Sequence, residues 1–163
     1  MKKKNMETHL KINHLAPYLP YELLMFDDDN PNQYYPRLIG VLNDENIITS
    51  SPRFPYNYNC GISTFKPILR PLSGLTDDFL KEIFNDENLV IERLKYATIV
   101  KYQSMGEWFK EIIPIREVTD DRNGHLIYST WLFIELCKRH FDVFGLIPKG
   151  LAIDINKIGG KNE

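Results

Sequence analysis

Three groups of residues in this 163-residue chain have types and spacings that bear on chemistry, and the first resembles a calcium loop. Asp28, Asn30 and Asn32 fit the first three ligand positions of such a loop. Gln33 stands where the glycine is expected, and Ile39 stands where the bidentate acid is expected. The segment therefore lacks both the sharp turn and the strongest ligand, and we expect a solvated loop and no metal.

Histidines and cysteines form the second group, and they lack the spacing of a metal site. The chain has four histidines, His9, His14, His125 and His140, and none is paired at the i, i+4 spacing of a zinc helix. Cys60 and Cys137 are distant in sequence, which indicates reduced thiols in a cytosol. His140 and Asp142 are two apart and would point in different directions on a helix. We expect His140 to interact with a helix C-terminus.

The third group is the stretch SPRFPYNYNCG, which spaces Phe54, Tyr56 and Tyr58 two residues apart and places Arg53 beside them. If this backbone is extended, the three rings point to one side. Such a platform would stack bases or anchor a protein partner. The alternative is that the rings cover a small N-terminal sheet.

Motifs of the common enzyme classes are missing from the sequence. The chain has no glycine-rich phosphate loop, no Gly-x-Ser-x-Gly elbow and no acid-x-Lys pair of the kind that many nucleases use. We therefore expect no cofactor and favour a protein that is not an enzyme. A small enzyme whose site is assembled from scattered residues stays open as an alternative.

The elements that must position these residues are predicted to be strands in the first half of the chain. The best candidates cover residues 22–26, 37–43 and 46–51, and the last two are expected to pair as a hairpin. Two prolines restrict residues 65–72 to an edge strand or an extended segment.

The second half is predicted to be more helical. Thr76 is a good N-cap for the sequence LTDDFLKEIFN. SMGEWFKEIIP contains a potential capping box, Ser104 with Glu107, followed by apolar residues at helical spacing. Between these segments, residues 90–103 alternate like a half-buried strand.

The longest predicted helix precedes an unusually apolar C-terminal stretch, HFDVFGLIPKGLAIDIN. A turn at Asp120–Gly124 leads into a helical stripe: Ile127, Thr130, Trp131, Ile134, Cys137, Phe141 and Phe144. Gly145 fits the left-handed position after the helix. Leu151, Ile153 and Ile155 then alternate inward in a closing strand. We expect this stretch to lock the fold and not to form an active site.

Composition limits the class of protein. The chain is 43% hydrophobic and 26% charged with a net charge of −2, which fits an ordinary globular protein with no general affinity for nucleic acid or acidic membranes. The N-terminus has no secretory h-region, and no apolar run reaches membrane-span length. We expect a single α+β domain over residues 1–163, with a possible subdivision into 1–75 and 76–163. Its fold would be a small proline-rich antiparallel β region, two to three helices and a C-terminal strand.

Three segments of the sequence resemble a family of small uncharacterised proteins encoded by bacteriophages and prophages of gut bacteria. They are LKINHLAPYLPY (Leu10–Tyr21), KPILRPLSGL (Lys66–Leu75) and HFDVFGLIPKGLAIDIN (His140–Asn156). The resemblance does not extend to Tyr96–Tyr128. It implies a phage-type accessory protein in a bacterial cytoplasm, and it carries no catalytic or binding residue over to this chain.

We therefore expect a non-enzymatic accessory protein that binds a host or phage macromolecule, with a protein partner favoured. The runner-up is a nucleic-acid-binding accessory protein that uses Arg53, Phe54, Tyr56 and Tyr58.

Overall fold

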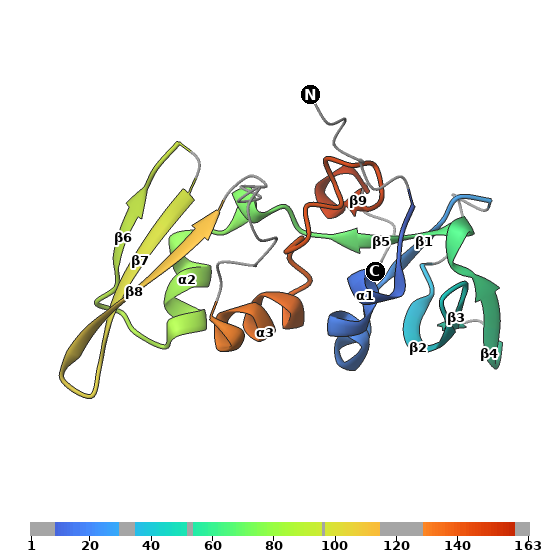
Figure 1. Cartoon of the computed structure of the whole chain (residues 1–163), viewed down its shortest axis with the longest axis horizontal. Coiled ribbons are helices and arrows are strands. Elements are labelled where there is room, and N and C mark those ends of the chain that lie inside the picture. The colour runs from blue at the N-terminus through green and yellow to red at the C-terminus, as the bar shows by residue number, and fades with distance from the viewer. Residues whose placement is uncertain (1–8, 30–34, 52–53, 96, 115–128, 159–163) are drawn as a thin grey trace, which may run out of the picture. The chain divides into compact units, whose positions relative to one another are not determined.

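The computed structural model in Figure 1 describes residues 9–29, 35–51, 54–95, 97–114 and 129–158. Within these ranges, short helices and three three-stranded sheets confirm mixed α+β content. The chain forms two compact units: unit 1 is Met1–Arg70 with Cys137–Glu163, and unit 2 is Pro71–Leu136. Among the described helices, none has the length and apolar character needed to cross a membrane.

The first sheet of unit 1 contains the predicted hairpin. β2 (Arg37–Asn43), β3 (Asn46–Ser51) and β4 (Phe54–Gly61) are antiparallel in that order. In the β2–β3 turn, the Asn43 side chain accepts hydrogen bonds from the Glu45 N–H and the Asn46 amide, each at 3.0 Å. The two predicted strands and their pairing are thus confirmed.

The second sheet of unit 1 has the order β1 (Met25–Asp27), β5 (Phe65–Leu69), β9 (Ile153–Asp154). The prediction of an edge strand at 65–72 was wrong, because β5 is the central strand. Pro67 pairs with Met25 of antiparallel β1, and the parallel pairing to β9 starts only at Ile68. Pro67 therefore precedes the residues of β5 that pair with strands on both sides. Its missing N–H costs little at that position.

Short helical turns complete unit 1. α1 (Ile12–Leu15) continues directly into the 3-10 helix η1 (Ala16–Tyr21). Three further 3-10 turns follow along the chain: η2 (Ile62–Thr64) and η4 (Ile155–Lys157) in unit 1, and η3 (Leu72–Gly74) in unit 2.

The C-terminal stretch is held in unit 1 by buried hydrogen bonds. The hydroxyl of fully buried Tyr18 donates to the Phe141 carbonyl at 2.7 Å. The buried Asp142 carboxylate accepts the N–H groups of Leu146 and Ile147, both at 2.8 Å. Phe141, Val143 and Leu146 are also buried. These contacts support the structural role that the apolar sequence predicted.

The end of this stretch differs from the prediction in detail. β9 has only two residues, and Ala152 is buried whereas Leu151, Ile153 and Ile155 are half-buried. The predicted alternation was therefore wrong, because residues 146–152 form turns and bends before the short strand begins.

Unit 2 contains a helix and an antiparallel sheet. α2 (Asp77–Phe84) begins as predicted, with the Thr76 hydroxyl accepting the Phe79 N–H at 3.2 Å. The sheet has the order β6 (Val90–Arg93), β7 (Ala97–Ser104), β8 (Glu107–Pro114). The predicted strand at 90–103 is therefore two strands.

The predicted helix at 104–114 was wrong, because this segment is strand β8. Met105 and Gly106 have φ values of 51° and 84° and form a two-residue turn between β7 and β8. Ser104 and Glu107, which suggested a capping box, are the last cross-strand pair of this hairpin. Residues three apart lie close together both at the start of a helix and across a two-residue hairpin turn. The spacing of Ser104 and Glu107 therefore does not distinguish a helix from a hairpin.

α3 (Thr130–Lys138) is shorter than predicted. Gly145 is left-handed as predicted, with φ of 62°, but the left-handed residue that lies just after the end of α3 is His140, with φ of 58°. The predicted stripe was wrong at Trp131 and Ile134, which are exposed, and was confirmed at Cys137, which is buried on this helix together with Leu132 and Leu136. The turn predicted at Asp120–Gly124 lies outside the described residues.

Candidate functional site

The predicted aromatic platform falls on β4. Phe54, Tyr56 and Tyr58 belong to this strand, as an extended backbone requires, and Arg53 lies outside the described residues. Ser51 pairs with Phe54 while Ser50 pairs with Asn57, so an irregularity interrupts the register within the platform. The platform therefore stays a prediction of the sequence.

The calcium-like loop uses its described acids for local contacts. The Asp27 carboxylate accepts the Asp29 N–H at 2.9 Å, and Asp28 forms an ion pair with Lys66 at 2.8 Å. In the parts of the chain that the structure describes, no three metal-ligating side chains are grouped to hold an ion. Asn30, Asn32 and Gln33 lie outside those parts.

Two of the described histidines, His140 and His14, have structural surroundings. His140 is half-buried, and its Nε2 lies 2.7 Å from the Tyr21 carbonyl. Burial lowers the pKa of His140 below its ordinary value of 6.5. His14 is buried, and its Nδ1 accepts the Lys11 N–H at 3.2 Å. Tyr21 is the last residue of η1, so His140 does meet a helix C-terminus, but that of η1 and not that of α3, which ends before it at Lys138.

The two cysteines are free thiols. The Cys60 sulfur lies 3.4 Å from the Thr49 hydroxyl. Cys137 is buried, and this burial raises the pKa of its thiol to about 12. A thiol with such a pKa stays protonated at neutral pH and is a poor nucleophile.

Among the side chains that the structure describes, sequence reasoning missed a prominent exposed apolar group at the end of the β7–β8 hairpin. We call residues Tyr102–Phe109 the hairpin tip. β6 pairs with β7 only from Thr98 to Lys101, so the tip extends beyond the third strand (Figure 1). Met105 is fully exposed, Trp108 is 62% exposed and Phe109 is 45% exposed.

The base of the tip is fixed by a series of aromatic contacts within unit 2. Phe109 stacks on Tyr102 across the strands, with ring centres 5.6 Å apart. Phe84 of α2 lies 4.8 Å from Tyr102 and 5.1 Å from Trp131 of α3. Such ring pairs each contribute roughly 0.5–1.5 kcal/mol beyond area burial. The tip is therefore anchored to the helices at one face while its end stays in solvent.

The two faces of the tip differ in charge. Side chains alternate along β8, so Trp108 and Lys110 share one face whereas Phe109 and Glu111 share the other. The proximity of Glu111 is reflected at Tyr102, whose pKa is raised first by burial and then by the Glu111 charge. Each face of β8 therefore carries one aromatic ring. The charge beside that ring is positive on the face of Trp108 and negative on the face of Phe109.

One sequence signal for the tip was available. Val100, Lys101, Tyr102 and Gln103 before Gly106 alternate between apolar and polar types as in a strand, and a glycine after such a strand is typical of a hairpin turn, although residues 107–113 after it do not alternate. Comparison of the chain with known protein families, curated proteins and solved structures gave no significant match.

Proposed function

We propose that the protein is a non-enzymatic accessory protein that binds a partner protein through the hairpin tip. The observation that carries this proposal is the exposure of Met105, Trp108 and Phe109 on strands that extend past β6. Methionine and large aromatic residues are enriched where proteins meet. A two-stranded extension with apolar groups on both faces is more stable when a partner covers it.

Charge supports a protein partner over nucleic acid. Residues 71–136, which make up unit 2, contain 7 Lys+Arg and 12 Asp+Glu, a net charge of −5. Phosphate contacts normally dominate affinity for nucleic acid, and a negative unit repels them. The partner expected here has an apolar groove with an acidic group opposite Lys110, which shares the face of Trp108.

The setting we propose is a bacterial cytoplasm during phage or prophage activity, with a host or phage protein as the partner. Support for this setting comes from the resemblance of Leu10–Tyr21, Lys66–Leu75 and His140–Asn156 to phage-encoded proteins. The setting and the mode of binding are separate proposals, since the exposed tip does not depend on the origin of the chain.

The proposal is tested by comparing two aromatic surfaces in one capture experiment. Immobilised wild-type protein, Trp108→Ala and Tyr56→Ala/Tyr58→Ala are each incubated with lysate of the bacterial host. We expect Trp108→Ala to lose the bound partner and the β4 variant to retain it. Loss of a central aromatic anchor commonly costs about 2 kcal/mol or more, which corresponds to roughly thirtyfold weaker affinity.

The reverse result would transfer the binding site to β4. Retention by Trp108→Ala with loss by the β4 variant contradicts a hairpin site. Nuclease treatment separates partner classes in the same experiment, because capture that disappears on digestion of nucleic acid supports the nucleic-acid alternative.

A further inference from the structure

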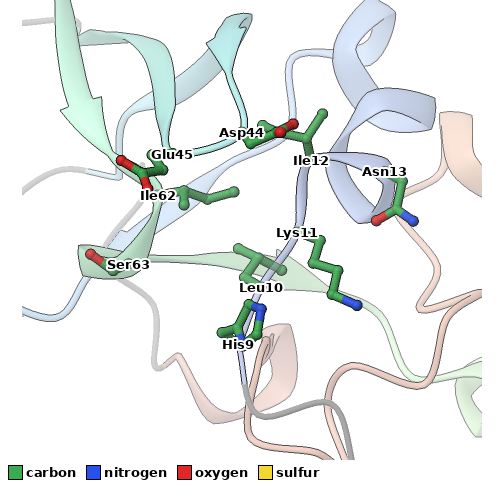
Figure 2. A pocket seen from close by; sticks show the side chains of 9 residues that line it. All are labelled: His9, Leu10, Lys11, Ile12, Asn13, Asp44, Glu45, Ile62 and Ser63. Atoms are coloured by element: carbon green, nitrogen blue, oxygen red, sulfur yellow. The ribbon is translucent and has the colours of Figure 1, made fainter.

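A groove of about 650 Å³ in unit 1 does not bring its charged groups to one point. It is lined by residues 9–13, Asp44, Glu45, Ile62 and Ser63. Figure 2 shows the Asp44 and Glu45 side chains pointing apart, and the cationic Lys11 lines the same groove. Groups that can act together occur instead along the outer side of β8 in unit 2.

β8 is the last strand of its sheet. Within the described residues, β7 pairs along one side of β8 and no strand pairs along the other (Figure 1). A two-residue turn is flanked by a hydrogen-bonded pair, here Ser104 and Glu107, and from there hydrogen-bonded and non-hydrogen-bonded pairs alternate. The backbone N–H and C=O groups of residues 108, 110 and 112 therefore point away from β7. We call these groups the β8 edge.

The side chains of the same three residues share one face of the sheet. Trp108, Lys110 and Ile112 alternate with Ile113 and its neighbours, and Ile113 is buried, so these three lie on the outer face. Trp108 and Ile112 are both exposed, one on each side of Lys110. A strand added at the β8 edge would use the backbone groups and cover these two apolar side chains at once.

The charge of Lys110 is not balanced on its own face. Lys110 lies directly opposite Lys101 of β7, and like charges in that position are destabilising. Lys101 has a carboxylate, that of Glu92, at 3.9 Å, whereas Lys110 has no ion pair within the described residues. Glu107 and Glu111 alternate with Lys110 and point to the other face. An acidic side chain opposite Lys110 on an added strand would offset this repulsion.

The charges of β8 disfavour pairing with a second copy of the chain. Opposite residues of antiparallel strands share a face, so the two-fold axis of such a dimer passes at one residue and not between two. In the registers that pair all of residues 108–112 with β8 of the second copy, this residue is Lys110 or Glu111. Each register thus places two identical charges opposite each other, as natural edge strands do to avoid self-association.

We propose that the partner protein adds an extended segment to the β8 edge as an antiparallel strand, with an acidic residue opposite Lys110 and apolar residues opposite Trp108 and Ile112. This inference rests on the proposed function and specifies it, because the added strand forms one wall of the partner's apolar groove. Main-chain hydrogen bonds give such a complex its affinity, and the alternate side chains give it selectivity.

The direct probe is the end-capped heptapeptide Thr-Val-Thr-Glu-Thr-Val-Thr, added to the full chain and followed by backbone amide NMR. With its glutamate opposite Lys110, its valines lie opposite Trp108 and Ile112. We expect saturable shifts and slower hydrogen exchange at these three amides. The amides of Phe109 and Glu111, which point towards β7, should change little.

N-methylation of the peptide separates strand pairing from side-chain contact. A methyl group on the glutamate nitrogen removes the donor that faces β8 and should weaken binding about tenfold or more. Methylation of the two threonines beside it, whose N–H groups face away, should have little effect.

A charge exchange tests the role of Lys110. Lys110→Glu should bind the glutamate peptide roughly twofold to fivefold more weakly, as a cross-strand pair predicts. The same variant should bind a peptide with lysine in place of the glutamate more tightly than the wild type does. Lys110 is exposed, so the fold should survive, and an unchanged amide spectrum elsewhere verifies this.

The proposal is overturned if the glutamate peptide does not bind at about 1 mM, if methylation of its glutamate has no effect, or if Lys110→Glu does not exchange the preference. It is also overturned if the three edge amides become protected as the protein concentration rises without peptide, because a second copy then occupies the edge.

Failure of this proposal can be distinguished from failure of the proposed function by capture from host lysate. Lys110→Pro removes an N–H that β7 does not use, so the hairpin should persist, as its amide spectrum would verify. We expect both Lys110→Pro and Trp108→Ala to lose the partner. Retention by Lys110→Pro with loss by Trp108→Ala overturns the edge pairing and leaves the proposed function standing, whereas retention by both variants overturns both.

Discussion

Replacing Tyr18 with phenylalanine removes one oxygen atom from the point where η1 meets the C-terminal stretch. That oxygen donates to the Phe141 carbonyl at 2.7 Å and accepts the Val143 N–H at 3.4 Å, in a fully buried position. The Val143 N–H also donates to the Phe141 carbonyl at 2.9 Å, so each backbone group keeps one partner. We therefore expect the free energy of unfolding to fall by about 1–2 kcal/mol, towards the lower end of the cost of a buried hydrogen bond left unmade.

Urea denaturation followed by circular dichroism measures this loss, and Tyr21→Phe provides the matched control. Tyr21 belongs to the same 3-10 helix, and within the described residues its hydroxyl forms no hydrogen bond. The control should cost less than about 0.5 kcal/mol, as substitutions away from specific contacts usually do. Equal losses in the two variants would refute the idea that the Tyr18 hydroxyl holds the C-terminal stretch in place.

Three further predictions concern the same unit. Phe141→Ala should lower the free energy of unfolding by about 3–5 kcal/mol in urea, because Phe141 is almost fully buried; a loss smaller than that of Tyr18→Phe would show that its packing contributes little. Burial lowers the pKa of His140 from 6.5, so the unfolded chain takes up a proton first and stability should fall as the pH drops below about 6.5. His140→Asn, which tolerates the left-handed backbone, should flatten this pH profile, and parallel profiles would contradict the assignment. Tyr56→Ala/Tyr58→Ala should leave the melting midpoint nearly unchanged, within about 0.5 kcal/mol, if β4 carries an exposed platform; a large drop in a thermal melt would instead indicate core residues.

The sequence predicted correctly those elements whose ends are fixed by residues close by in the chain. The β2–β3 hairpin was predicted correctly because apolar runs flank the short turn at Asp44 and Glu45. α2 was predicted correctly because Thr76 and its two acidic neighbours define the start of a helix. Both elements contain, within a few residues, the information that fixes their ends.

The prediction failed where the sequence fitted both a helix and a strand. It also failed where contacts to residues distant in the chain determine where an element ends. Trp108, Phe109, Ile112 and Ile113 fit a helical face, yet the Met105–Gly106 turn places them on a strand. α3 ends early, and Arg70 hydrogen-bonds on both sides of Phe141, accepting the Asp142 N–H and donating to the His140 carbonyl. No local pattern reveals a partner so far away in the chain.

The candidate site was the least predictable feature. Sequence reasoning selected Arg53–Tyr58 because three rings are spaced two residues apart, and it assigned the aromatic residues of β8 to a helix core. The exposure of Trp108 and Phe109 depends on where β6 stops pairing with β7, which is a property of the assembled sheet.

The measurement that tests the central claim most directly is photo-crosslinking from the hairpin tip in the bacterial host. A benzophenone amino acid replaces Met105, which is fully exposed, and in a control it replaces Ser73, which is exposed on η3. We predict a discrete adduct with one protein from position 105, resistant to nuclease and absent in the Trp108→Ala background, and no such adduct from position 73. The same adduct from both positions, no adduct from the tip, or an adduct lost on nuclease treatment would contradict binding of a protein through the hairpin.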